Sequence, residues 1–250
     1  MYPHDGESKQ QNKRKNVNYL SVGEDTKTIK GEKFGYLTGI LYMAPAQVAG
    51  GRNMCPFSTA GCRAACLYTA GRGGFNSVQQ GRIRKTLEFQ ADPKKFCELI
   101  VKDIKSLIIK AANKGLTPAV RLNGTTDIEW EKYGIMEQFP DIQFYDYTKW
   151  PCGKRMSLPK NYHLTYSFSE KPRAGLDSVG WKMRGVNTAV VFWGGLPKTF
   201  LINTTDLPVI DGDLSDLRFN DPKGVVIGLK AKGAARGVVA VDTGFVQKVG

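Results

Sequence analysis

Three cysteines lie within twelve residues of this 250-residue chain, in the run C-P-F-S-T-A-G-C-R-A-A-C that begins at Cys55, ends at Cys66 and includes Cys62. A loop interrupted by proline and glycine can bring such thiolates around a metal ion or an iron–sulfur cluster without long-range folding. A four-iron cubane needs four ligands, so three cysteines leave one iron open to a small molecule. We therefore expect Cys55, Cys62 and Cys66 to bind a [4Fe–4S] cluster.

Other interpretations of this loop stay open. A structural zinc ion would need a fourth ligand, and neither interval in the loop is the C-x-x-C pair common at zinc sites. A disulfide with one spare thiol would need an oxidising compartment, whereas the N-terminus lacks the charged-then-apolar order of a signal peptide. Three separately buried thiols would suit an apolar run, but Arg63 and Arg72 lie in or next to the loop. Cys97, in a predicted helix, and Cys152, in a Pro-Cys-Gly turn, are expected to stay outside the site.

Positive charge gathers around the cysteines. The chain has a net charge of +13, and the stretch from Arg52 to Lys85 contains six Lys or Arg side chains and no Asp or Glu. Such a surplus favours an anionic partner, although solvated charge runs also serve solubility. We expect a positively charged rim for an anionic substrate, with DNA or RNA as candidates, formed by Arg52, Arg63, Arg72, Arg82 and Arg84.

Other catalytic chemistries have weaker support in the sequence. Only His4 and His163 are present, so a hydrolase triad would rest on His163, which lies in an aromatic run typical of packed residues. Carboxylates at predicted strand ends could hold a divalent cation over a phosphate, which would make the chain a phosphoryl-transfer enzyme or a nuclease. These carboxylates are Asp127, Asp146, Asp211, Asp213 and Asp216. That alternative leaves the cysteines without a role.

The elements that position these residues follow from periodicity. The composition, 41% hydrophobic, is enough for a buried core, and the apolar runs are far too short to cross a bilayer. We expect a flexible basic and polar segment over residues 1–33 and a single domain over residues 34–250. A strand is predicted over Phe34–Met43, before the cysteine loop, and helices over Gln79–Gln90 and from Pro93, capped by Asp92, to a stop at Gly115.

Short apolar runs then recur at intervals of about twenty residues, and several of them end in polar side chains. The predicted strands are Ala119–Leu122, Ile142–Tyr147, Tyr162–Phe168, Thr188–Trp193, Leu207–Asp211 and Val225–Lys230. Repeated strands with polar ends indicate an α/β fold, an incomplete or decorated parallel β/α barrel with its site at the carboxyl ends of the strands. Dinucleotide-binding and Walker-type glycine motifs are absent from the sequence.

The order of a strand, a cysteine loop and a series of β/α units resembles the radical S-adenosylmethionine superfamily. More closely, four runs of this chain look like the phage gene product 88 domain family, over nearly everything from Leu37 to the end. These runs are M-C-P-F-S-T-A-G-C-R-A-A-C-L-Y-T-A-G-R-G, R-L-N-G-T-T-D-I, F-Y-D-Y-T-K and V-V-I-G-L-K-A.

The superfamily resemblance implies a second cofactor, S-adenosylmethionine, bound on the open iron. It places the cofactor's amino group and ribose near two strand ends, at Asn123, Gly124, Thr125 and Asp127 and at Ser167 and Ser169. The chain departs from the superfamily in its C-x6-C-x3-C spacing, where C-x3-C-x2-C is usual. It also lacks the acidic residue that commonly follows the paired glycines, unless Asp127 substitutes for it.

These observations favour a radical-type iron–sulfur enzyme that acts on an anionic substrate. One alternative is a nucleic-acid-binding phage protein with a structural zinc or cysteine site; the other is the divalent-metal enzyme described above. The expected location is the cytoplasm, which is that of the host if a phage encodes the chain.

Overall fold

The computed structural model describes residues 18–23, 26–237 and 241–249. Its strands are β1 (Leu20–Val22), β2 (Tyr36–Leu41), β3 (Thr117–Arg121), β4 (Gln143–Thr148), β5 (Tyr162–Ser167), β6 (Thr188–Trp193), β7 (Thr199–Ile202), β8 (Thr205–Asp211), β9 (Val226–Lys230) and β10 (Val246–Lys248). Its helices are α1 (Thr26–Glu32), α2 (Ala60–Ala64), α3 (Asn76–Ala91), α4 (Pro93–Asn113) and α5 (Ala174–Met183). All seven predicted strands and both predicted helices are confirmed, with ends shifted by a few residues.

The strands form one ten-stranded sheet in a mixed α/β fold, with the order β1-β2-β3-β4-β5-β6-β9-β8-β7 and β10 beside β6. Every neighbouring pair from β2 to β8 along this order is parallel, while the outermost strands β1 and β7 are antiparallel to their neighbours. The sheet does not close on itself, because β1 and β7 remain its two edges. The α/β class and the largely parallel sheet are therefore confirmed; a barrel is not.

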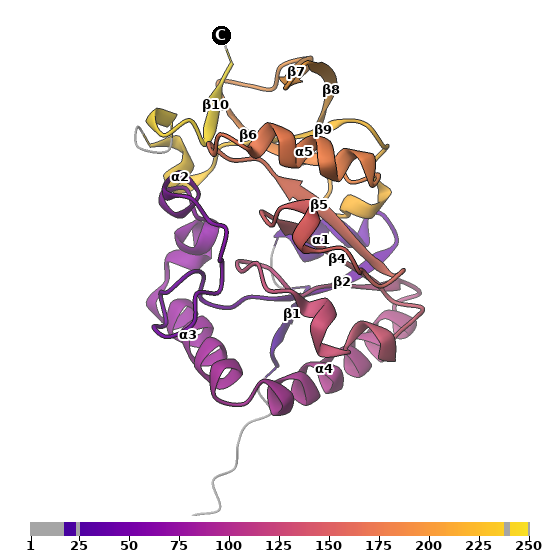
Figure 1. The fold of residues 1–250 in the computed structure, drawn as a ribbon. Coiled ribbons are helices and arrows are strands. Elements are labelled where there is room, and N and C mark those ends of the chain that lie inside the picture. Colours follow the sequence, from indigo (N-terminus) through magenta and orange to yellow (C-terminus); the bar gives the residue numbers. More distant parts are fainter. Residues whose placement is uncertain (1–17, 24–25, 238–240, 250) are drawn as a thin grey trace, which may run out of the picture.

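Regular structure begins before the expected domain boundary at residue 34. Strand β1 pairs with β2, and α1 lies on the far side of the sheet in Figure 1. Residues 1–17, which make up much of the predicted flexible segment, lie outside the described residues.

Helix α4 covers one face of the sheet with its apolar stripe. Asp92 caps its first turn by accepting a hydrogen bond from the Lys95 N–H at 3.0 Å, and Pro93 occupies the position where a missing N–H costs nothing. The stripe packs against Leu37 and Val120 in the main core cluster, which also contains Trp181 of α5. Figure 1 shows α4 along one side of the molecule and α5 in front of β6 and β9.

On the opposite face of the sheet, the connection between two strands packs against β3 and β4. Residues 212–225 connect β8 to β9, and Leu217 in this connection packs against Ala119 and Tyr145. Burial on both faces explains why the predicted strands read as nearly continuous apolar runs.

Strand β10 separates the ends of two neighbouring strands. Strand β5 pairs with β6 only at Thr188 and Ala189, whereas β10 pairs with the later half of β6, from Val191 to Trp193. The carboxyl end of β5 therefore leaves the sheet beside the C-terminal strand. The cysteine loop lies beside this C-terminal strand, because Cys62 and Ala65 pack in one cluster with Phe245 and Val246.

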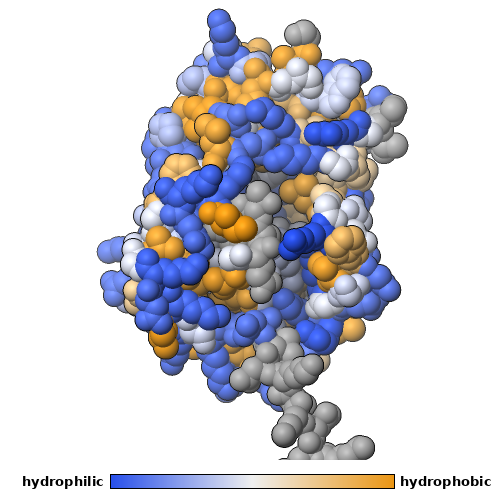
Figure 2. All heavy atoms as spheres, turned by 180° about the vertical axis from the view of Figure 1, so that it is seen from behind, coloured by the Kyte–Doolittle hydropathy of each residue, from blue (hydrophilic) through white to orange (hydrophobic). Residues whose placement is uncertain are grey.

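The molecular surface is mainly polar on the face drawn in Figure 2, where apolar residues form separate small groups. Within the described part of the chain, no helix combines the length and the apolar character that a membrane crossing requires.

Candidate functional site

Cys55, the first residue of the cysteine loop, contacts the chain after β2 and the turn after β3. Its sulfur accepts a hydrogen bond from the Ala46 N–H at 3.3 Å and lies 3.7 Å from the Thr125 carbonyl oxygen, to which it can donate. Its own N–H donates to the Asn53 side chain at 2.9 Å. The loop after β2 and the turn after β3 are thus joined at the first cysteine.

Helix α2 explains the long interval between the first two cysteines. Thr59 caps this helix, because its hydroxyl accepts a hydrogen bond from the Cys62 N–H at 3.0 Å and donates to the Glu170 carboxylate at 2.7 Å. Four residues after Cys62, Cys66 precedes a short 3-10 helix over Leu67–Thr69. The six residues between Cys55 and Cys62 therefore form a turn and the start of a helix.

The three thiols share one electrostatic neighbourhood. All three are free and partly buried. Burial is the main cause that raises the pKa of Cys55 to about 12, and Asp127, Cys62 and Cys66 raise it further. Burial also raises the pKa of Cys66, and Cys62 adds to that shift. The thiolate forms of Cys55 and Cys66 are therefore disfavoured by burial and by neighbouring negative charge.

The other two cysteines are placed elsewhere, as the sequence predicts. Cys97 lies on α4 in the main core, where burial alone raises its pKa to about 11. Cys152 lies in a short turn after β4, against the backbone of Gly180 in α5. Among the described residues, no three His, Cys, Asp or Glu side chains are gathered closely enough to hold one metal ion.

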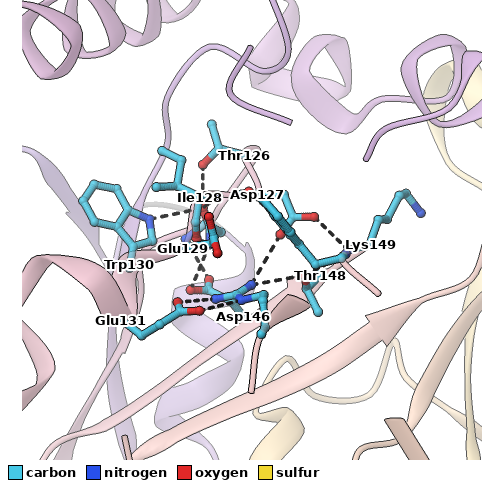
Figure 3. A network of polar contacts seen from close by, with 12 residues as sticks. Thr126, Asp127, Ile128, Glu129, Trp130, Glu131, Asp146, Thr148 and Lys149 are labelled. Atoms are coloured by element: carbon cyan, nitrogen blue, oxygen red, sulfur yellow. Dashed lines mark hydrogen bonds and ion pairs between the residues drawn. The ribbon is translucent and has the colours of Figure 1, made fainter. Parts of the chain in front are cut away.

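Lys149 is the cation that the sequence interpretation missed. Its ammonium group donates to the Ser167 carbonyl and hydroxyl oxygens at 3.1 and 2.8 Å and to the Phe168 carbonyl oxygen at 3.0 Å, and it lies 4.8 Å from the centre of the Phe245 ring. Burial lowers its pKa, and a charge on Cys62 opposes that shift more than any other group does. Figure 3 shows the Lys149 side chain pointing away from the buried network around Asp127.

Arg82 is a second cation beside the thiols. Its guanidinium donates to the Tyr68 carbonyl oxygen at 2.9 Å and lies over the Tyr42 and Tyr68 rings, at 5.0 and 5.4 Å from their centres. It lowers the pKa of Cys66. The remaining four residues of the predicted rim, Arg52, Arg63, Arg72 and Arg84, are exposed, whereas Arg82 is partly buried and belongs to the cysteine site.

Asn123 and Gly124 shape the turn after β3. The side-chain oxygen of Asn123, Oδ1, accepts hydrogen bonds from Thr126, Ile128 and Trp130, and its side-chain nitrogen, Nδ2, donates to the Ile128 carbonyl oxygen. A Cβ atom on Gly124 would lie 2.6 Å from the Tyr42 ring and 2.7 Å from a β2 carbonyl oxygen. The hydrogen bonds of Asn123 are therefore directed into the turn itself.

Asp127 links the cysteine loop to a buried charge network (Figure 3). Its backbone N–H donates to the Met54 carbonyl oxygen, and its carboxylate accepts from the Lys149 N–H at 2.7 Å and lies 3.6 Å from Arg155. Arg155 also donates to Glu131 at 2.7 Å. Burial raises the pKa of Asp127, and Arg155 opposes that shift.

The residues predicted after β5 lie beside the same loop. Ser167 contacts the Lys149 ammonium, and Ser169 is buried. The following Glu170 accepts hydrogen bonds from Thr59 and from the Gly61 N–H at the start of α2. Thr125, Asp127 and Ser167 are thus brought to the cysteine site, directly or through Lys149, while Asn123 and Gly124 support the turn beneath it.

The carboxylates considered for a divalent cation have side-chain or backbone partners of their own. Asp146 accepts hydrogen bonds from Asn123 and Tyr162 at 2.7 and 2.9 Å. The three at and after the end of β8 form ion pairs with basic side chains, Asp211 with Lys230 at 2.7 Å, Asp213 with Lys232 at 2.6 Å and Asp216 with Arg121 at 2.8 Å.

Comparison with known proteins identifies one family. The family model described as Gene product 88 matches residues 7–248, which is nearly the whole chain. No curated protein and no solved structure matches. The family that the sequence motifs resemble is therefore confirmed, and the function has to be argued from the site.

Proposed function

This chain belongs to the Gene product 88 family, and we propose that it is an iron–sulfur enzyme of the radical S-adenosylmethionine kind that acts on an anionic substrate, with nucleic acid as the first candidate. The observation that carries the proposal is the trio of free, partly buried thiols in one loop. Cys62 and Cys66 both influence the pKa of Cys55, and the loop follows β2, which begins a run of parallel strands.

The chemistry of the donors suits a cluster, because one short loop offers three free thiols; in the described residues these thiols are not yet gathered closely enough to hold one metal ion, so cluster binding would have to draw them together. Deprotonating buried thiols is unfavourable unless a metal or a nearby cation compensates. Lys149 and Arg82 supply such cations, since each interacts with a thiol of the trio. Their ammonium and guanidinium groups would offset the negative charge of the thiolates and of the cluster. A binding site for uncharged ligands would not need them.

A [4Fe–4S] cluster with one iron free of protein ligands supplies, when bound, the reductive cleavage of S-adenosylmethionine. In this proposal Thr125, Asp127, Ser167 and Ser169 line the space next to the thiols. Asn123 and Gly124 keep the β3 turn in place. The exposed Arg63 and Arg72 lie in or next to the same loop and attract the anionic substrate.

Metal analysis of anaerobically purified and reconstituted protein tests the cluster. We expect about four iron atoms per chain, lost in Cys55→Ala, Cys62→Ala and Cys66→Ala and kept in the matched control Cys97→Ala. Adding S-adenosylmethionine to the dithionite-reduced protein should perturb the electron paramagnetic resonance spectrum and release 5′-deoxyadenosine.

Three results would overturn the assignment in whole or in part. A colourless protein with one zinc ion per chain would favour the nucleic-acid-binding alternative with a structural cysteine site. Loss of iron in Cys97→Ala alone would show that the ligands were wrongly assigned. An unchanged spectrum with S-adenosylmethionine would leave an iron–sulfur protein without this cofactor.

A further inference from the structure

A segment of the chain fills the face of the sheet that α4 leaves uncovered. Within the 212–225 connection, Phe219 packs edge-on against Tyr36 and Tyr145, and the centre of its ring lies 5.2 and 5.3 Å from theirs. Leu217 completes this contact. We call residues 214–221 the crossing segment.

Two arginines are buried between the sheet and the crossing segment. Arg121 of β3 is 5% exposed and Arg218 of the segment is 1% exposed. Arg121 lies over the Tyr147 ring, 4.8 Å from its centre, and pairs with Asp216 of the segment. Tyr147 is influenced electrostatically by both arginines and by Asp216, which places it at the centre of the group.

The pairing between Arg121 and Asp216 leaves part of the guanidinium unused. One nitrogen, Nη1, donates to both carboxylate oxygens, at 2.8 and 3.2 Å. A planar two-nitrogen pairing, the geometry that carboxylates and phosphates favour, would use Nη1 with Nη2 or Nε with Nη2. In the described part of the chain, Arg121 Nε is buried without a hydrogen-bond partner.

Further unpaired atoms lie on the same face. His163 Nε2 and Thr165 Oγ1, both on β5, and Arg218 Nη1 are buried and have no hydrogen-bond partner among the described residues. Thr165 is the register partner of Tyr147, and His163 is influenced by the charge of Arg218. Buried polar atoms are normally satisfied, so a group of unpaired ones indicates a missing partner. The arginine nitrogens among them can only donate, and the threonine hydroxyl and the imidazole can donate as well, which suits an anion.

The crossing segment satisfies much of its own hydrogen-bonding capacity. The Leu217 N–H donates to the Ser215 hydroxyl, the Arg218 N–H to the Asp216 carbonyl and the Asn220 N–H to the Leu217 carbonyl. Just outside the segment, the Gly212 N–H donates a hydrogen bond to the Gly228 carbonyl oxygen of β9, and the Pro222 carbonyl oxygen accepts one from the Asn187 side chain. The ion pair between the crossing segment and the sheet is formed by Asp216, and hydrogen bonds hold both ends of the segment in place. A shift of the segment between these two anchored ends would leave the pairing of the parallel strands intact.

We propose that Arg121 is the centre of an anion-binding site on this face, that Asp216 occupies it in the present structure, and that a small ligand with a phosphate or carboxylate group takes the place of Asp216. The site is distinct from the cysteine loop and does not depend on the iron–sulfur proposal. The exchange preserves charge balance, because Arg121 and Arg218 face Asp216 and Asp221, and the ligand replaces one carboxylate by another anionic group.

Titration of the full-length chain with inorganic phosphate and, separately, with succinate at constant ionic strength tests this proposal and distinguishes the two ligand chemistries. We expect Asp216→Asn to bind the preferred anion at least tenfold more tightly than the parent, because the competing carboxylate is removed. The double variant Arg121→Gln/Asp216→Asn should lose this binding. Asp206→Asn, which removes an exposed carboxylate on β8, should bind as the parent does.

Hydrogen exchange of the parent protein gives a second readout that needs no variant. Saturating anion should speed exchange in residues 214–221 while the parallel strands stay protected. The proposal fails if neither anion binds Asp216→Asn more tightly than the parent, or if the double variant keeps the binding. It also fails if added anion slows exchange in the crossing segment.

Discussion

At the scale of single residues, Asp146 shows how burial changes the behaviour of an ordinary carboxyl group. Its side chain is fully buried and accepts hydrogen bonds from the Asn123 N–H and the Tyr162 hydroxyl. Burial raises its pKa from 3.8 to about 7, although Arg121 and these hydrogen bonds oppose the shift. The folded protein therefore holds a proton on Asp146 over a pH range in which the unfolded chain has released it.

This shift predicts a pH-dependent stability that Asp146→Asn removes. Because the folded-state pKa is raised, the contribution is fully present below pH 3.8 and is lost as pH rises towards about 7. The difference in unfolding free energy between parent and variant should fall by about 4 kcal/mol across that window and stay constant above it. Urea unfolding at a series of pH values measures it. A difference independent of pH would contradict the raised pKa.

Lys149 allows a second residue-scale prediction. The Lys149 ammonium group donates hydrogen bonds to the Ser167 and Phe168 carbonyl oxygens, and Lys149→Met removes this donor. We expect the free energy of unfolding to fall by about 1–3 kcal/mol and iron retention to fall several-fold. The control is Lys182→Met, an exposed lysine on α5. Equal iron content in both variants would remove Lys149 from the site.

At the scale of elements, the turn after β3 reaches the cysteine loop because it packs closely on β2. Gly124→Ala would place a methyl group 2.6 Å from Tyr42 and 2.7 Å from the Leu41 carbonyl oxygen, contacts that the backbone cannot easily relieve. We expect a loss of about 1–3 kcal/mol in unfolding free energy.

The matched control is Gly81→Ala in α3, where a Cβ atom would meet nothing within 4 Å. There alanine should stabilise the helix by about 0.5–1 kcal/mol. Thermal and urea unfolding of the two variants measure both effects. The packing argument would be wrong if Gly124→Ala were as stable as the parent.

At the scale of the whole molecule, the net charge of +13 predicts salt-dependent binding of nucleic acid. Replacing the exposed Arg63 and Arg72 by alanine should weaken binding of single-stranded DNA or RNA and lower the slope of log affinity against log salt by about 1.4. Fluorescence anisotropy at several salt concentrations measures the slope. The double variant Lys102→Ala/Lys105→Ala, on the exposed side of α4, is the control. Equal slopes in both variants would reduce the rim to a solubility feature.

The sequence by itself determined the elements whose signals are local. The strands of the parallel sheet and the long helix α4 follow from apolar periodicity and from the cap at Asp92, which act over a few residues. The spacing of Cys55, Cys62 and Cys66 indicated one site because a short loop limits how far its thiols can separate. The short strands β1, β7 and β10 carry too few residues for such a signal.

Only the tertiary structure decided which side chains meet. It turned Arg82 from a rim residue into a neighbour of Cys66, brought Lys149 to the thiols and directed the hydrogen bonds of Asn123 into its own turn. It also placed Asp216 against Arg121, although the two are separated by 95 positions in the chain. Ion pairs and burial depend on residues far apart in sequence, so spacing and periodicity carry no information about them.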